Sequence, residues 1–127
     1  MESNLPGSLR KWFIIHFFAD IVFALPLLIS PRWFMGLFGF NVGDTLTVRL
    51  VGAALAGIGL TSLVMHGKGI ESYDAMLTLK IIWSVTAIVA ILLSIIDGGP
   101  DSQWFFLAIF TVFSAVWIYY KNIVINR

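Results

Sequence analysis

The chain has 127 residues, of which 59% are hydrophobic and 12% charged, with a formal net charge of +1. Ordinary soluble domains have about 25% charged residues, so a water-soluble globular protein is excluded. Eight Lys and Arg against seven Asp and Glu leave no basic field, which excludes nucleic acid as a partner. The lack of cysteine excludes disulfides and thiolate metal sites.

Four apolar runs are long enough to cross a bilayer, which requires about 17–25 residues in a helix. They cover residues 12–29, 46–65, 75–96 and 104–120. Hydrocarbon offers no partners for backbone N–H and C=O groups, and the period of two typical of strands is missing, so each run is expected to be a helix. The sequence therefore predicts an all-α integral membrane protein, a four-helix transmembrane bundle forming a single domain over residues 1–127.

The segment between the first two spans predicts a short extra helix. Ser30 followed by Pro31 is typical of an N-cap with proline at the first helical position, and Gly39 suits the helix end. The residues between are too few to span a membrane and too apolar for a solvated loop. We therefore expect an interfacial helix, or a shallow re-entrant one, over about 31–38.

The later spans have start signals of their own. Asp44 is an expected N-cap of the second span and Ser72 of the third, with Asp74 adding a favourable charge to that first turn. The residues 97–101, Asp-Gly-Gly-Pro-Asp, predict a turn before the fourth span.

Basic residues outside the spans predict the orientation. One side of the bilayer has five of them, whereas the other has Arg32 alone. The five are Arg10, Lys11, Lys68, Lys121 and Arg127. Because basic loops stay inside, the sequence predicts a multi-pass protein of the cell membrane with N- and C-termini in the cytoplasm.

Ionisable residues within the spans are the candidates for function, because each costs about 2.5–3.5 kcal/mol at the centre of a bilayer. His16 and Asp20 are four residues apart and share one helix face. Lys80 lies about one and a half turns into the third span from the same side of the membrane. These three residues form a candidate intramembrane binding cluster.

Two interpretations of this cluster are open. In the functional one, it is an inward-facing proton-linked or anion-binding site, with Asp20 titrating, Lys80 as counter-charge and His16 as relay. In the structural one, the charges specify helix packing and Lys80 extends to the headgroups. Arg49 lies about one turn inside the outer boundary, so we expect it to bind a lipid headgroup or to act as a cap with Asp44.

Small residues on the second span predict close helix packing. Gly52 with Ala56, and Ala53 with Gly57, are spaced four apart, which lets two helix backbones approach within the bundle or between protomers. A flexible gate is the alternative interpretation of the same residues.

No pattern of catalytic or metal-binding residues is recognisable, and no cofactor is predicted. His16 and His66 would permit a haem with two histidine ligands, but a histidine at a helix end is more simply solvated. Two histidines without a third ligand also make a poor zinc site. A non-enzymatic role is therefore preferred, although an enzyme acting on a lipid stays open.

Two segments carry a family resemblance. They are LPLLISPRWFMGLFG at residues 25–39 and RLVGAALAGIGL at residues 49–60. Their order resembles that of small DoxX-like membrane proteins, under half of the chain being covered. The resemblance implies a prokaryotic four-helix membrane protein of a group whose better-known members accompany membrane redox enzymes.

Two hypotheses of function follow. In the first, the protein acts through assembly among membrane lipids, as a homo-oligomer or as an accessory subunit of a larger membrane complex. In the second, it is a small transporter, a channel or a binder of a lipid or small ligand that uses the His16, Asp20 and Lys80 cluster.

Overall fold

The computed structural model describes residues 5–125, which form five helices and no strand. Four are long: α1 (Gly7–Ile29), α3 (Thr45–Met65), α4 (Ile70–Ile96) and α5 (Gln103–Ile125). The short α2 (Pro31–Leu37) lies between the first two long helices. All four long helices are long and apolar enough to cross a membrane. The predicted all-α fold is confirmed; Arg127, used for the orientation, lies outside the described residues.

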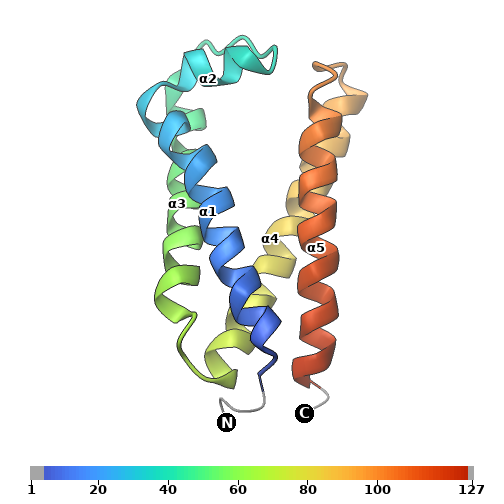
Figure 1. Cartoon of the computed structure of the whole chain (residues 1–127). Helices are drawn as coiled ribbons and strands as arrows, with labels where there is room; N and C mark the ends of the chain where they lie inside the picture. Colours follow the sequence, from blue (N-terminus) through green and yellow to red (C-terminus); the bar gives the residue numbers. More distant parts are fainter. Residues whose placement is uncertain (1–4, 126–127) are drawn as a thin grey trace. The chain divides into compact units, whose positions relative to one another are not determined.

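The chain divides into two compact units. The first, Pro6–Gly67, contains α1, α2 and α3, and the second contains Leu5 and residues 68–125, with α4 and α5. In the first unit α1 and α3 run antiparallel side by side, and α2 crosses one end of the pair (Figure 1). In the second unit α4 and α5 form an antiparallel helical hairpin (Figure 1). The single-domain description stays a prediction.

The two long helices of the first unit each have one buried stripe. Along α1 the buried residues recur every three or four positions, as they do along α3, which keeps them on one face. They are Leu9, Phe13, His16, Asp20, Ala24 and Leu27 on α1, and Gly52, Leu55, Gly59 and Ser62 on α3. The stripes on α1 and α3 are the sides on which the helices pack.

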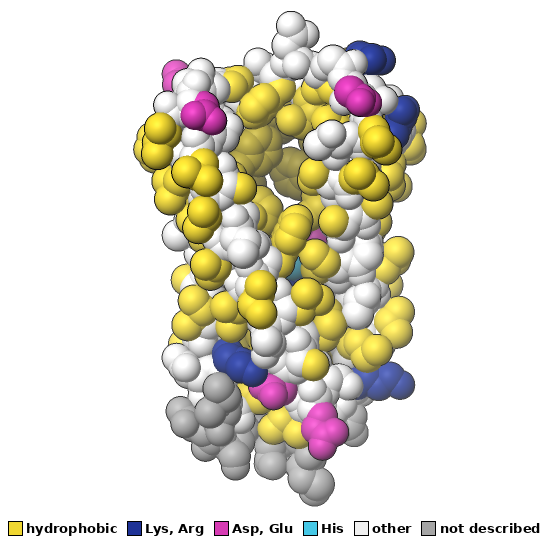
Figure 2. All heavy atoms as spheres, turned by 180° about the vertical axis from the view of Figure 1, so that it is seen from behind, with side chains coloured by type: hydrophobic (Ala, Val, Ile, Leu, Met, Phe, Trp, Pro, Cys, Tyr) yellow, Lys and Arg dark blue, Asp and Glu magenta, His cyan; other side chains and the backbone are white. Residues whose placement is uncertain are grey.

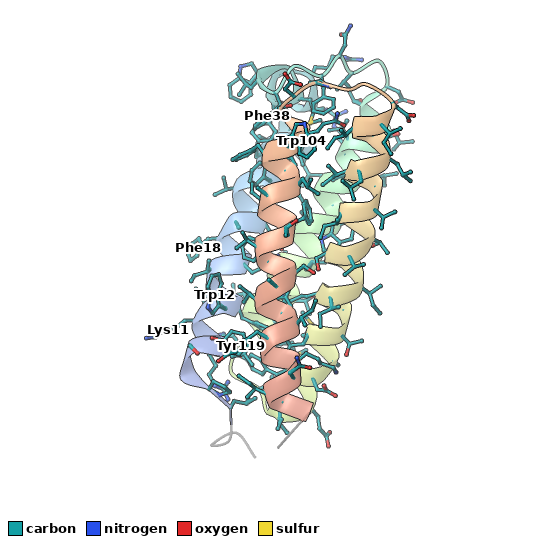
Figure 3. The ribbon with its side chains drawn as sticks, turned by 90° about the vertical axis from the view of Figure 1, so that its right-hand side faces the viewer. Lys11, Trp12, Phe18, Phe38, Trp104 and Tyr119 are labelled. Carbon is teal, nitrogen blue, oxygen red and sulfur yellow. The ribbon has the colours of Figure 1, made fainter. Side chains whose placement is uncertain are left out.

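The other faces of the helices are apolar and exposed. Phe18, for example, is 60% exposed and points away from α1, as Lys11 does further along the helix (Figure 3). On the face seen in Figure 2, hydrophobic side chains cover the middle of the helices, and the outward-facing acidic and basic side chains lie toward their ends. Such extensive exposed apolar surface is suited to lipid and not to water. The four long apolar helices make the chain a multi-pass membrane protein.

The predicted stop and cap signals before α3 are confirmed. Gly39 follows α2 with a positive φ of 86° and donates its N–H to Gly36 O at 3.1 Å, while Phe40 N–H bonds Met35 O at 3.1 Å. This pair of bonds is the Schellman arrangement, which favours glycine at that position. Asp44 caps α3, since its Oδ1 accepts the N–H of Leu46 at 2.9 Å.

The prediction that Ser72 is the N-cap of the third span is wrong. Helix α4 begins at Ile70, with Gly69 at the cap position, so Ser72 lies within the first helical turn. The reason is that the buried stripe of α4 begins at Tyr73, before the apolar run. Tertiary packing stabilises a helix, so the packed residue Tyr73 lets α4 begin before its hydrophobic run.

Arginine side chains join α1 and α3 at both ends. Arg10, in the first turn of α1, donates a hydrogen bond to His66 O at the end of α3. Arg49, near the start of α3, donates from Nε to Leu28 O near the end of α1, at 3.0 Å. Each cation therefore binds a carbonyl at the C-terminus of the other helix. Carbonyls at that end lack hydrogen-bond partners within the helix, and the helix dipole is negative there.

The two arginine contacts also give a length along the helix axis. Arg10 and Leu28 are 18 residues apart, which corresponds to about 27 Å of α-helix. The hydrocarbon core of a bilayer is about 30 Å thick. The contacts therefore lie near the two ends of the segment that a membrane would cover.

The α4/α5 hairpin has polar contacts at both ends as well. At the turn, Ser94 Oγ donates to Gln103 Oε1, and Gln103 Nε2 donates to Pro100 O at 3.2 Å. At the open end, Lys121 Nζ forms an ion pair with Asp74 and donates to Thr78 Oγ1 at 2.8 Å. The apolar middle of each pair is thus bounded by polar contacts.

Candidate functional site

His16 and Asp20 lie together on the buried stripe of α1. Nε2 of His16 is 3.4 Å from Oδ1 of Asp20, and the two side chains are only 6% and 8% exposed. Their spacing of four residues places them one helical turn apart on the same face. This histidine–aspartate pair is an ion pair whenever the imidazole is protonated.

Asp20 lies near the middle of the segment bounded by the two arginine contacts. It is ten residues from Arg10 and eight from Leu28, or about 15 Å and about 12 Å along the helix. The apolar run at residues 12–29 gives nearly the same position, because Asp20 is eight residues from Trp12 and nine from Ile29.

Helix α3 approaches Asp20 at Gly59. A Cβ atom added to Gly59 would lie 2.9 Å from Cβ of Asp20 and 3.4 Å from its Oδ2. The first distance is too short for two carbon atoms, so only glycine permits this approach of α3 to the histidine–aspartate pair. Ser62 is buried on the same face of α3, and its Oγ donates to Ile58 O at 2.9 Å.

The four predicted packing residues divide between two faces of α3. Gly52 faces α1, where an added Cβ would lie 3.1 Å from Leu27 Cβ. Ala53 and Gly57 are exposed, and Ala56 is half-buried. An added Cβ on Gly57 would meet no described atom within 4 Å. The face toward α1 thus combines Gly52 with Gly59, seven residues apart, which the four-residue spacing does not reveal.

Lys80, the third member of the predicted cluster, belongs to α4 in the second unit. It is fully buried, and its Nζ lies 4.9 Å from the centre of the Trp117 ring on α5. A cation over an indole ring contributes about 2 kcal/mol when desolvated. This contact explains how α5 helps to hold the ammonium group; its association with His16 and Asp20 stays a prediction.

Arg49 occupies a capping position. Besides the bond to Leu28 O, its NH1 donates to Thr45 Oγ1 at 3.0 Å, whereas Asp44 caps the N-terminus of α3. The predicted partner Asp44 is therefore replaced by a backbone carbonyl of α1. The role of Arg49 in binding a lipid headgroup stays a prediction.

Comparison with known proteins adds no relative to this picture. No family model, curated protein or solved structure matches the chain. The resemblance to DoxX-like proteins stays a prediction. Within residues 5–125, no three His, Asp or Glu side chains are grouped so that they could hold a metal ion.

Proposed function

We propose that this protein is a small transporter or channel in which the histidine–aspartate pair binds a proton within the membrane. The observation that carries the proposal is the burial of His16 and Asp20 in contact with each other near the middle of α1. Ionisable groups at that depth are costly, and in membrane proteins they mark proton and ion pathways. Imidazole changes its charge near neutral pH, which suits it to pass a proton to a carboxylate.

The residues of the pair have different tasks in this proposal. Asp20 holds the proton at the greater depth, about 15 Å from the level of Arg10. His16 lies about 9 Å from that level and relays the proton between Asp20 and the helix end. Gly59 keeps α3 close to the carboxyl group, so that lipid and water do not surround it.

We further propose that the protein lies in the cell membrane with both termini in the cytoplasm. More basic residues lie near the chain termini and in the connection at residues 67–69 than on the other side of the spans, which supports this orientation. The bond from Arg10 to His66 supports a common side for the start of α1 and the end of α3. The ion pair of Asp74 and Lys121 does the same for α4 and α5. His16 is then on the cytoplasmic side of Asp20.

Difference infrared spectroscopy of the full-length protein in lipid vesicles tests proton binding directly. When the buffer pH is lowered, we expect the wild type to gain the C=O band of a carboxylic acid in apolar surroundings. Asp20→Asn should lack this band. Asp97→Asn, at the exposed C-cap of α4, is the matched control and should keep it. A band of unchanged size in Asp20→Asn would refute the proposal.

A second proposal is that the protein also assembles, as a homo-oligomer or as an accessory subunit of a membrane complex. The observation in its favour is the exposed face of α3, where residues recur at alternating intervals of four and three. These residues are Leu46, Leu50, Ala53, Gly57, Leu60 and Val64. This is the spacing of a helix-pairing face, with small residues at its centre that let a second helix come close.

Cysteine crosslinking in native membranes tests the assembly. The chain has no natural cysteine, so a single introduced one reports on its own position. Gly57→Cys is expected to give a covalent dimer on mild oxidation, and Phe18→Cys on the exposed face of α1 is the control. Recovery of monomer alone from Gly57→Cys would count against a homo-oligomer built on this face.

A further inference from the structure

The end of the first unit that carries α2 holds two ordered arginines. Arg32 donates from Nε to Val42 O at 3.3 Å and from NH2 to Gly43 O at 2.9 Å. Arg49 donates to Leu28 O and Thr45 Oγ1, both at 3.0 Å. A guanidinium group has five N–H donors. Each of these arginines uses two of them on described residues, which leaves three for a ligand.

The loop before α3 connects these two groups. Arg32 binds the carbonyls of Val42 and Gly43, and Arg49 binds the hydroxyl of Thr45, two residues further along. Asp44 lies between them, and its Oδ1 is engaged by the first turn of α3. Two arginines and one aspartate leave a local charge of +1. The guanidinium groups are thus held in place, exposed, and suited to an anion.

Helix α2 presents an apolar face beside Arg32. Trp33 and Leu37 are four residues apart on one side and are 63% and 62% exposed. On the other side Phe34 packs edge-to-face on Phe23 of α1 and on Phe38. The distances between the ring centres are 5.7 Å and 5.3 Å. With one face fixed to the protein, the exposed tryptophan and leucine are typical of a helix at a membrane interface.

We propose that Arg32 and Arg49 bind the phosphate of an anionic phospholipid, whose acyl chains lie against Trp33 and Leu37. Guanidinium groups match phosphate oxygens with paired N–H donors, and here they are already ordered by backbone carbonyls. A phospholipid joins a phosphate to apolar chains, as this surface joins arginines to an apolar helix face. The site is independent of the histidine–aspartate pair, so either can fail without the other.

Quenching of Trp33 fluorescence by brominated lipids tests this site in the full-length protein. The contribution of Trp33 is the difference between the wild type and Trp33→Phe in vesicles of phosphatidylcholine mixed with phosphatidylglycerol. Bromine is placed on the chains of one lipid at a time. Because each interfacial arginine favours an anionic lipid by about fivefold, we expect brominated phosphatidylglycerol to be enriched at Trp33 by at least that factor.

Arginine variants separate this site from general attraction to the membrane. Arg32→Gln should lower the enrichment at least about fivefold, whereas Lys11→Gln, near the opposite end of α1, should leave it unchanged. Arg49→Gln is a second variant that should also lower it. Equal quenching by both lipids in the wild type, or enrichment that survives in both arginine variants, would overturn the proposal. Loss of enrichment on adding soluble glycerol phosphate would overturn the choice of a lipid.

Discussion

Replacing Gly59 by alanine should destabilise the α1/α3 pair by about 1–3 kcal/mol, the usual effect of overpacking a well-packed contact. The new Cβ would lie 2.9 Å from Cβ of Asp20, an atom fixed to the helix backbone. Rotation of the Asp20 side chain does not move its Cβ and cannot relieve this clash, so the two helices must move apart. Thermal unfolding of the purified protein in detergent measures the change.

Gly57→Ala is the matched control for Gly59→Ala. It makes the same chemical change on the same helix, but the added methyl group meets no described atom within 4 Å. Alanine is the better helix former by about 1 kcal/mol, so in protein purified as the monomer, where no second copy packs on this face, the variant should unfold at the same temperature as the wild type or higher. Equal destabilisation by the two substitutions would show that α3 does not contact Asp20 through Gly59.

The bounds of the helices are predictable in part: α3 and α5 begin within one residue of their apolar runs, whereas α5 ends at Ile125, five residues beyond its predicted run. The ends at Ile29, Met65 and Ile96 coincide with those of the predicted spans, because turn residues follow them. The starts of α1 and α4 precede their apolar runs by five residues each. Buried Leu9 and Tyr73 extend the packing stripes into those more polar segments, and hydrophobicity alone does not record that packing.

The candidate site is predictable only in part for a similar reason. His16 and Asp20 are identifiable because both lie within one helix, where a spacing of four fixes their proximity. The sequence does not distinguish Gly59 from Gly57. They differ only in that Gly59 faces α1 and Gly57 does not. The bonds that Arg10 and Arg49 make to the neighbouring helix end on backbone carbonyls, which have no residue signature. The hydrogen bonds of Gln103 to Ser94 and Pro100 likewise depend on the turn that brings these residues together.

Asp20→Asn should abolish proton movement through the protein. Asparagine keeps the size of the side chain but cannot bind and release a proton, so a pathway through Asp20 would be interrupted at its deepest group. His16→Gln should slow proton movement, because His16 is the proposed relay. Asp97→Asn should have no effect, because Asp97 is exposed beyond the end of α4.

Proton entry into sealed vesicles containing the full-length protein tests the central claim most directly. A potassium diffusion potential drives protons inward, and a trapped pH-sensitive dye records their entry. We expect wild-type vesicles to acidify faster than protein-free vesicles, and Asp20→Asn vesicles to match the protein-free rate. Wild-type vesicles no faster than protein-free ones, or Asp20→Asn vesicles as fast as wild type, would contradict a proton pathway through the histidine–aspartate pair.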